Sequence, residues 1–176
     1  ADEDAGRLLE IYLNDHRAGA TAGRALAERS AGSNQDTALG QYLTDEFLPQ
    51  LAVDRQLAER VRGRLGARDN PGKQFAARAG ELIGRLKLNG QIRGYSPLSR
   101  ILELEALVAA VSAKRQLWRL LATLTTVESN GFEDRIVIAD QQRDRLEEFH
   151  RSAVVELFGS IDVTAPDERG AGPTPS

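Results

Sequence analysis

Apolar residues recur at spacings of three and four over long stretches of the chain, which is the pattern of one buried face of an α-helix. Groups of Gly, Asn, Ser and Pro, which commonly end helices, separate five such stretches. They predict helices over residues of about 4–30, 35–65, 73–88, 97–127 and 132–159. No stretch of strict alternation indicates a β-strand, so we expect an all-α protein.

The predicted helix 35–65 carries polar residues inside its apolar stripe. Glu46, Gln50 and Asp54 follow one another at intervals of four, which places them on one side of a regular helix. Pro49 lies between the first two and is expected to kink the helix, because proline has no backbone N–H to donate. An unpaired buried charge costs several kcal/mol, so these side chains need partners. Three readings remain open: a metal ion, a salt-bridge network with Arg17, Arg55 or Lys114, or a solvated edge that needs no partner.

Two other predicted helices have distinctive faces. The helix 97–127 is apolar around most of its circumference, which predicts the most central position in the fold. Ser96 and Pro97 form a strong start for it, with serine as the N-cap and proline at the first helical position. In the first helix, Gly19 and Gly23 lower helix propensity, so we expect them to allow the close approach of a neighbouring helix.

Composition and charge exclude several classes of protein. The 176 residues carry a net charge of −3 and no cysteine, which argues against a nucleic-acid partner and excludes disulfides and thiolate chemistry. The apolar run Ala106–Val111 is far too short to span a membrane, and no N-terminal segment resembles a signal peptide. We expect a cytoplasmic protein without a membrane partner, with one domain at 1–160 and a disordered tail at 161–176.

The helix lengths, the long connection after the second helix and the inward carboxylates and histidine resemble the ferritin-like superfamily. This resemblance implies an antiparallel four-helix bundle with an extra short helix, 73–88, between the second and third long helices. The stretches 12–23, 85–90 and 95–105 are also similar to a group of uncharacterised actinobacterial helical proteins, a resemblance that brings no known activity.

Ferritin-like di-iron proteins place a Glu on each of two helices and a Glu-x-x-His motif on each of the other two. Glu147 and His150 have that spacing here, whereas Pro49 stands where a histidine would follow Glu46. The resemblance therefore implies an altered site for Fe or Mn, whose candidate ligands are His16, Glu46, Asp54, Glu103 and His150.

Two functions remain open at this point. One is a non-enzymatic protein without a cofactor, in which the inward polar groups pair with each other and the helix faces bind a second copy or a protein partner. The other is a metal-binding oxidoreductase or iron-handling protein. A separate group of basic residues around the helix start at Ser96 is either an anion site or ordinary surface, and it consists of Arg85, Lys87, Arg93 and Arg100.

Overall fold

The computed structural model describes residues 2–66, 95–124 and 130–162. This part of the chain is helical and contains no β-strand, so the all-α prediction is confirmed. Its elements are α1 (Asp2–Ser33), α2 (Ala38–Tyr42), the π-helical turn η1 (Leu43–Phe47), α3 (Leu48–Arg64), α5 (Pro97–Leu124) and α6 (Asn130–Phe158). The predicted short helix 73–88 and residues 163–176 of the predicted tail lie outside the described residues.

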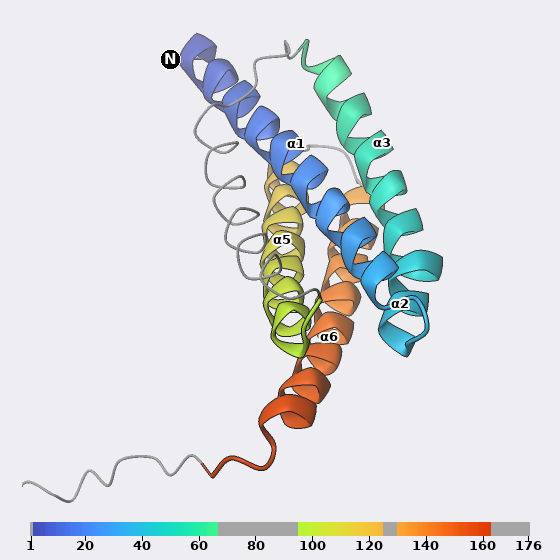
Figure 1. The fold of residues 1–176 in the computed structure, drawn as a ribbon. Helices are drawn as coiled ribbons and strands as arrows, with labels where there is room; N and C mark the ends of the chain where they lie inside the picture. The colour runs from blue at the N-terminus through green and yellow to red at the C-terminus, as the bar shows by residue number, and fades with distance from the viewer. Residues whose placement is uncertain (1, 67–94, 125–129, 163–176) are drawn as a thin grey trace, which may run out of the picture.

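The four long helices α1, α3, α5 and α6 pack lengthwise against one another (Figure 1). In Figure 1, α1 and α6 run downward, whereas α3 and α5 run upward. The cross-helix contacts agree with these directions. Arg17 pairs with Glu59, and Asn14, earlier in α1, pairs with Arg62, later in α3.

The turn between α1 and α2 depends on one glycine. Thr37 is the N-cap of α2, and its hydroxyl accepts a hydrogen bond of 3.2 Å from the Gly40 N–H. A Cβ atom on Gly40 would lie 2.0 Å from the backbone oxygen of Asn34. The close approach of the two backbones therefore requires a residue without a side chain.

The irregularity expected at Pro49 takes the form of a π-helical turn just before it. At the end of η1, the N–H of Leu48 donates to the carbonyl of Leu43, five residues back instead of four. Leu43 and Phe47 are buried on this turn, whereas Glu46 is exposed to solvent. The prediction that Glu46 faces inward is wrong, because a π-helical turn changes the phase of the residues before it relative to those after it.

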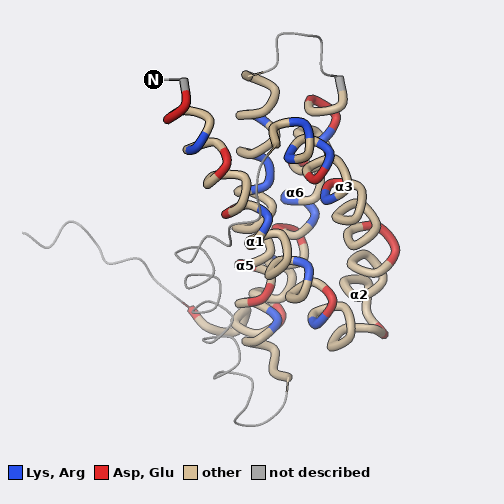
Figure 2. Tube along the Cα trace, turned by 90° about the horizontal axis from the view of Figure 1, so that it is seen from above, with Lys and Arg blue, Asp and Glu red and all other residues tan. Residues whose placement is uncertain are grey.

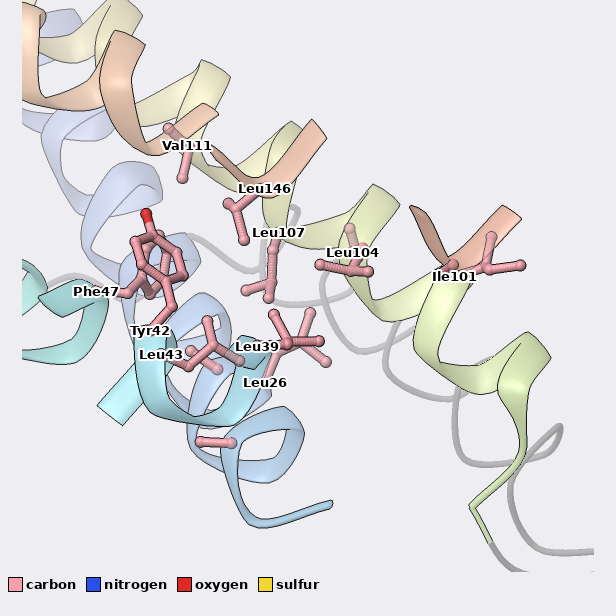
Figure 3. Packing of buried hydrophobic residues seen from close by; sticks show 14 of the residues in the cluster. Leu26, Leu39, Tyr42, Leu43, Phe47, Ile101, Leu104, Leu107, Val111 and Leu146 are labelled. Carbon is pink, nitrogen blue, oxygen red and sulfur yellow. The ribbon is translucent and has the colours of Figure 1, made fainter. Parts of the chain in front are cut away.

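Within the described residues the core forms two apolar clusters. The larger one joins α2, η1 and the lower half of α1 to α5 and α6 (Figure 3), and its largest members include Tyr42, Leu43, Phe47, Leu104, Leu107 and Leu146. The smaller one is built on Leu13, Leu117, Trp118 and Leu121. Ten residues of α5 are buried, which confirms its predicted central position.

Small residues bring α1 close to α5. A Cβ atom on Gly23 would lie 3.5 Å from the Cβ of Ala110, an ordinary van der Waals distance. A side chain would therefore fit at Gly23, so the prediction that glycine is needed here for a close helix approach is not borne out; the neighbouring helix, α5, belongs to the same chain. Among the described helices, none combines the length and the apolar character that a membrane crossing needs.

The charged residues are distributed over all four long helices. Seen from above, both basic and acidic residues lie on each of them (Figure 2). Two apolar residues of the predicted helix 35–65, Val53 and Leu65, are 45% and 52% exposed, so the buried face of this helix is narrower than its apolar residues indicate.

Candidate functional site

A cluster of polar side chains lies in the bundle between the two apolar clusters. Asp54 on α3 is 5% exposed and accepts a hydrogen bond of 2.7 Å from the Lys114 Nζ of α5. Arg135 of α6 lies on the other carboxylate oxygen, with 3.5 Å between Nη1 and Oδ1. The partners of Asp54 are therefore two basic side chains, and one of them, Lys114, was a predicted candidate.

Two glutamines extend this cluster. Lys114 Nζ also donates to the side-chain oxygen of Gln142, which is 5% exposed. Arg135 donates to the Gln50 side-chain oxygen at 3.1 Å. We call these five residues, which come from α3, α5 and α6, the Asp54 cluster.

The Asp54 cluster holds more positive than negative charge. Two cationic side chains surround one carboxylate, and the three side chains are 6% (Asp54), 13% (Lys114) and 15% (Arg135) exposed. Burial lowers the pKa of Lys114, and the Asp54 carboxylate opposes that shift. The arrangement fixes the relative positions of three helices, because each ion needs its partner when it is removed from water.

A second buried carboxylate has a different set of partners. Glu103 of α5 is fully buried and pairs with Arg29 of α1, whose Nε lies 2.9 Å from Oε1. Tyr95 donates its hydroxyl proton to Oε2 at 3.1 Å and accepts a hydrogen bond of 2.7 Å from the Asn34 side chain. Burial raises the pKa of Tyr95, so its hydroxyl stays protonated as a donor at neutral pH.

The two histidines have contacts of their own, separate from the Asp54 cluster and from the Glu103 group. His16 is half-buried and packs against Tyr12, with 4.4 Å between ring centroids and 55° between the ring planes. Burial lowers the pKa of His16, and Asp15 opposes this shift. His150 lies on the flank of α6, where its Nε2 is 3.2 Å from Oε1 of Glu105.

The structure therefore gives each predicted metal ligand its own surroundings. Within residues 2–66, 95–124 and 130–162, no three His, Asp or Glu side chains are grouped as a metal site requires. Asp54 and Glu103 are each bound by basic side chains, Glu46 is exposed, and the two histidines have separate neighbours.

Five members of the Asp54 cluster and of the Glu103 network were not predicted from the sequence: Arg29, Asn34, Tyr95, Arg135 and Gln142. A signal for two of them was present. Arg135 and Gln142 fall at helical spacing within the apolar stripe that contains Ala139 and Leu146, so they had to face the interior. No comparable signal marks Arg29, which is half-exposed and reaches Glu103 with its long side chain.

The predicted basic group near Ser96 lies mostly outside the described residues, which include only Arg100 of its four members. Arg100 pairs with Glu156 at 3.1 Å. The Ser96 hydroxyl accepts a hydrogen bond of 3.1 Å from the Ser99 N–H, which confirms the predicted N-cap.

Two open surface hollows lie on the described part of the bundle. One, of about 360 Å³, lies between α1 and α5 and is lined by Tyr12, Gln116, Arg119, Leu120, Thr123 and Leu124. The other, of about 510 Å³, lies between α1 and α3 and is lined by Arg24, Ala52, Arg55, Gln56, Glu59 and Arg60.

Comparisons with protein-family models, curated proteins and solved structures find no match to this chain.

Proposed function

We propose that this protein is a non-enzymatic helical scaffold with a ferritin-like bundle arrangement, which acts through association with a second copy or with another protein. The arrangement rests on the helix directions. The second and third long helices, α3 and α5, run in the same direction, and their partners α1 and α6 run in the opposite one (Figure 1). Ferritin-like folds have this order, with a long connection between the second and third helices.

The observation that carries the non-enzymatic part is the Asp54 cluster. Di-iron proteins of this architecture use carboxylates and histidines that project into the bundle from all four helices. Here Lys114 and Arg135 contact the inward carboxylate of Asp54, and Arg29 contacts that of Glu103. A metal ion at either carboxylate would have to displace a cation or share its surroundings, at a large electrostatic cost.

The association part is supported by apolar side chains on the outer surface. Leu8 and Leu124 are 60% and 58% exposed, and Leu124 lines the hollow between α1 and α5 together with Tyr12 and Leu120. Apolar side chains gathered at a hollow are typical of an interaction site.

Metal content tests the first part of the proposal. We expect protein purified without chelator to contain no stoichiometric Fe or Mn by elemental analysis. Its melting temperature is expected to stay unchanged on addition of Fe(II) or Mn(II). A ligand present at 100 times its dissociation constant stabilises a protein by about 2.7 kcal/mol, which a thermal melt detects readily. Stoichiometric metal together with a raised melting temperature would favour the alternative, an iron-handling or di-iron-like protein.

Mass in solution tests the second part. Sedimentation velocity over a series of concentrations is expected to show self-association that Leu124→Glu abolishes. Val155→Glu is the matched control, because Val155 is 64% exposed and lies outside the lining of the hollow. A wild-type protein that is monomeric at every concentration refutes self-association, and equal losses in the two variants refute the choice of surface.

A further inference from the structure

The hollow between α1 and α3 concentrates positive charge on a protein whose net charge is −3. Of its six lining residues, three are arginines and one is a glutamate. Two side-chain pairs on neighbouring turns hold the helices together along this groove: Arg17 with Glu59, and Asn14 with Arg62. The hollow thus has a fixed frame made of two helices.

The acidic group in the lining is already neutralised. Glu59 accepts from Arg17 at 3.0 Å through one oxygen and from Arg62 at 2.9 Å through the other. Its carboxylate is therefore largely engaged and does little to neutralise the other arginines of the hollow.

The arginines of the hollow retain unused donors. Arg24 has an exposed partner in Glu28 at 2.8 Å. In the described part of the chain, Arg55 and Arg60 have no acidic side chain within ion-pair distance. Both are exposed and line the hollow. Each guanidinium has five N–H donors arranged to bind the oxygens of a phosphate in pairs.

We infer that this hollow binds a multiply charged phosphate anion of the size of a di- or triphosphate. The volume of about 510 Å³ is within the range of small-ligand sites. Three guanidinium groups from two helices match the several oxygens of a polyphosphate better than those of a single carboxylate. None of the described residues that line it is aromatic, so recognition is of the phosphates rather than of a stacked nucleobase.

Calorimetric titration of the full chain with inorganic tripolyphosphate tests this inference. We expect saturable binding of one anion per chain that weakens as salt is added. A charge-assisted hydrogen bond is worth about tenfold in affinity, so Arg55→Gln/Arg60→Gln is expected to bind at least about tenfold more weakly. The single variants Arg55→Gln and Arg60→Gln serve the same purpose should the double variant fold poorly, which circular dichroism reports.

A variant that removes the same charge elsewhere on the surface distinguishes binding in this hollow from a general electrostatic effect of the protein's charge. Arg7→Gln/Arg151→Gln removes two exposed arginines that line neither hollow and is expected to keep nearly the wild-type affinity. Binding without saturation, or equal losses in the two double variants, would overturn the site. Citrate that binds as tightly as tripolyphosphate would overturn the assignment to phosphate.

Discussion

Replacing Asp54 with alanine removes the carboxylate that contacts two buried cations. Lys114 and Arg135 are 13% and 15% exposed, so water reaches them poorly once the carboxylate is gone. Breaking a buried ion pair by removing one partner costs about 3–5 kcal/mol. We expect about 3 kcal/mol here, because both cations keep a glutamine partner, Gln142 and Gln50.

Urea unfolding followed by circular dichroism measures this loss. With a slope of about 2 kcal/mol per molar urea, about 3 kcal/mol lowers the midpoint by about 1.5 M. Asp54→Asn keeps the shape of the side chain and removes its charge, so it is expected to lose most of the same stability. The double variant Asp54→Leu/Lys114→Met is expected to recover part of it, since it removes one buried cation together with the carboxylate.

An exposed ion pair provides the control. Glu148 accepts from Arg145 at 2.7 Å, as close as the Asp54 pair, but the two side chains are 55% and 51% exposed. Solvent screens such a pair, so Glu148→Ala is expected to cost about 0.5 kcal/mol or less. If Asp54→Ala costs no more than Glu148→Ala, the Asp54 cluster does not stabilise the bundle and the reasoning fails.

The remaining predictions concern the other buried groups and two glycines. Glu103→Leu is expected to cost about 1–2 kcal/mol in urea unfolding, less than Asp54→Ala, because Arg29 is 37% exposed and can return to water; an equal or larger loss contradicts this. Gly40→Ala is expected to destabilise by at least about 2 kcal/mol, because its Cβ would lie 2.0 Å from a backbone oxygen. Gly23→Ala is expected to stabilise by about 0.5–1 kcal/mol through helix propensity, and thermal melts that rank the two glycine variants otherwise refute the packing described. His16 has its pKa lowered from 6.5 by burial, so the unfolded chain takes up a proton more readily than the folded one. Its contribution to stability is therefore complete above pH 6.5 and is lost as the pH falls below that value. Melts from pH 7 to pH 5 are expected to show a smaller decrease for His16→Gln than for the wild type, and parallel decreases would contradict the buried position.

The helices follow from local features of the chain. Spacing of apolar residues depends on the geometry of a single helix, so the four long helices and the start at Ser96 were predictable. Helix ends were less exact, since α1 continues to Ser33 and the cap of the next helix is Thr37. The place where α1 ends and the next helix is capped depends on how closely the two helices approach, which the spacing of apolar residues does not report.

The polar interior was predictable in part. The sequence indicated that Asp54 and Glu103 face inward, and Lys114 was among the partners considered. Arg135 and Gln142 could have been found from their places in an apolar stripe. The five residues predicted as metal ligands share an inward or flanking position in the helical pattern of their own helices. That pattern does not give the distance between residues on different helices.

The sequence by itself determined that this chain forms long helices and that carboxylates lie on their inner faces, because both depend on periodicity within one helix. The tertiary structure decided which groups meet those carboxylates. Pairing across helices depends on the rotation and the axial offset of each helix relative to its neighbours, and these come from packing of the whole bundle. The π-helical turn at Leu43–Phe47 shows what the periodicity of a regular helix fails to predict. Its single change of phase turns Glu46 to solvent and leaves Asp54 in contact with Lys114 and Arg135.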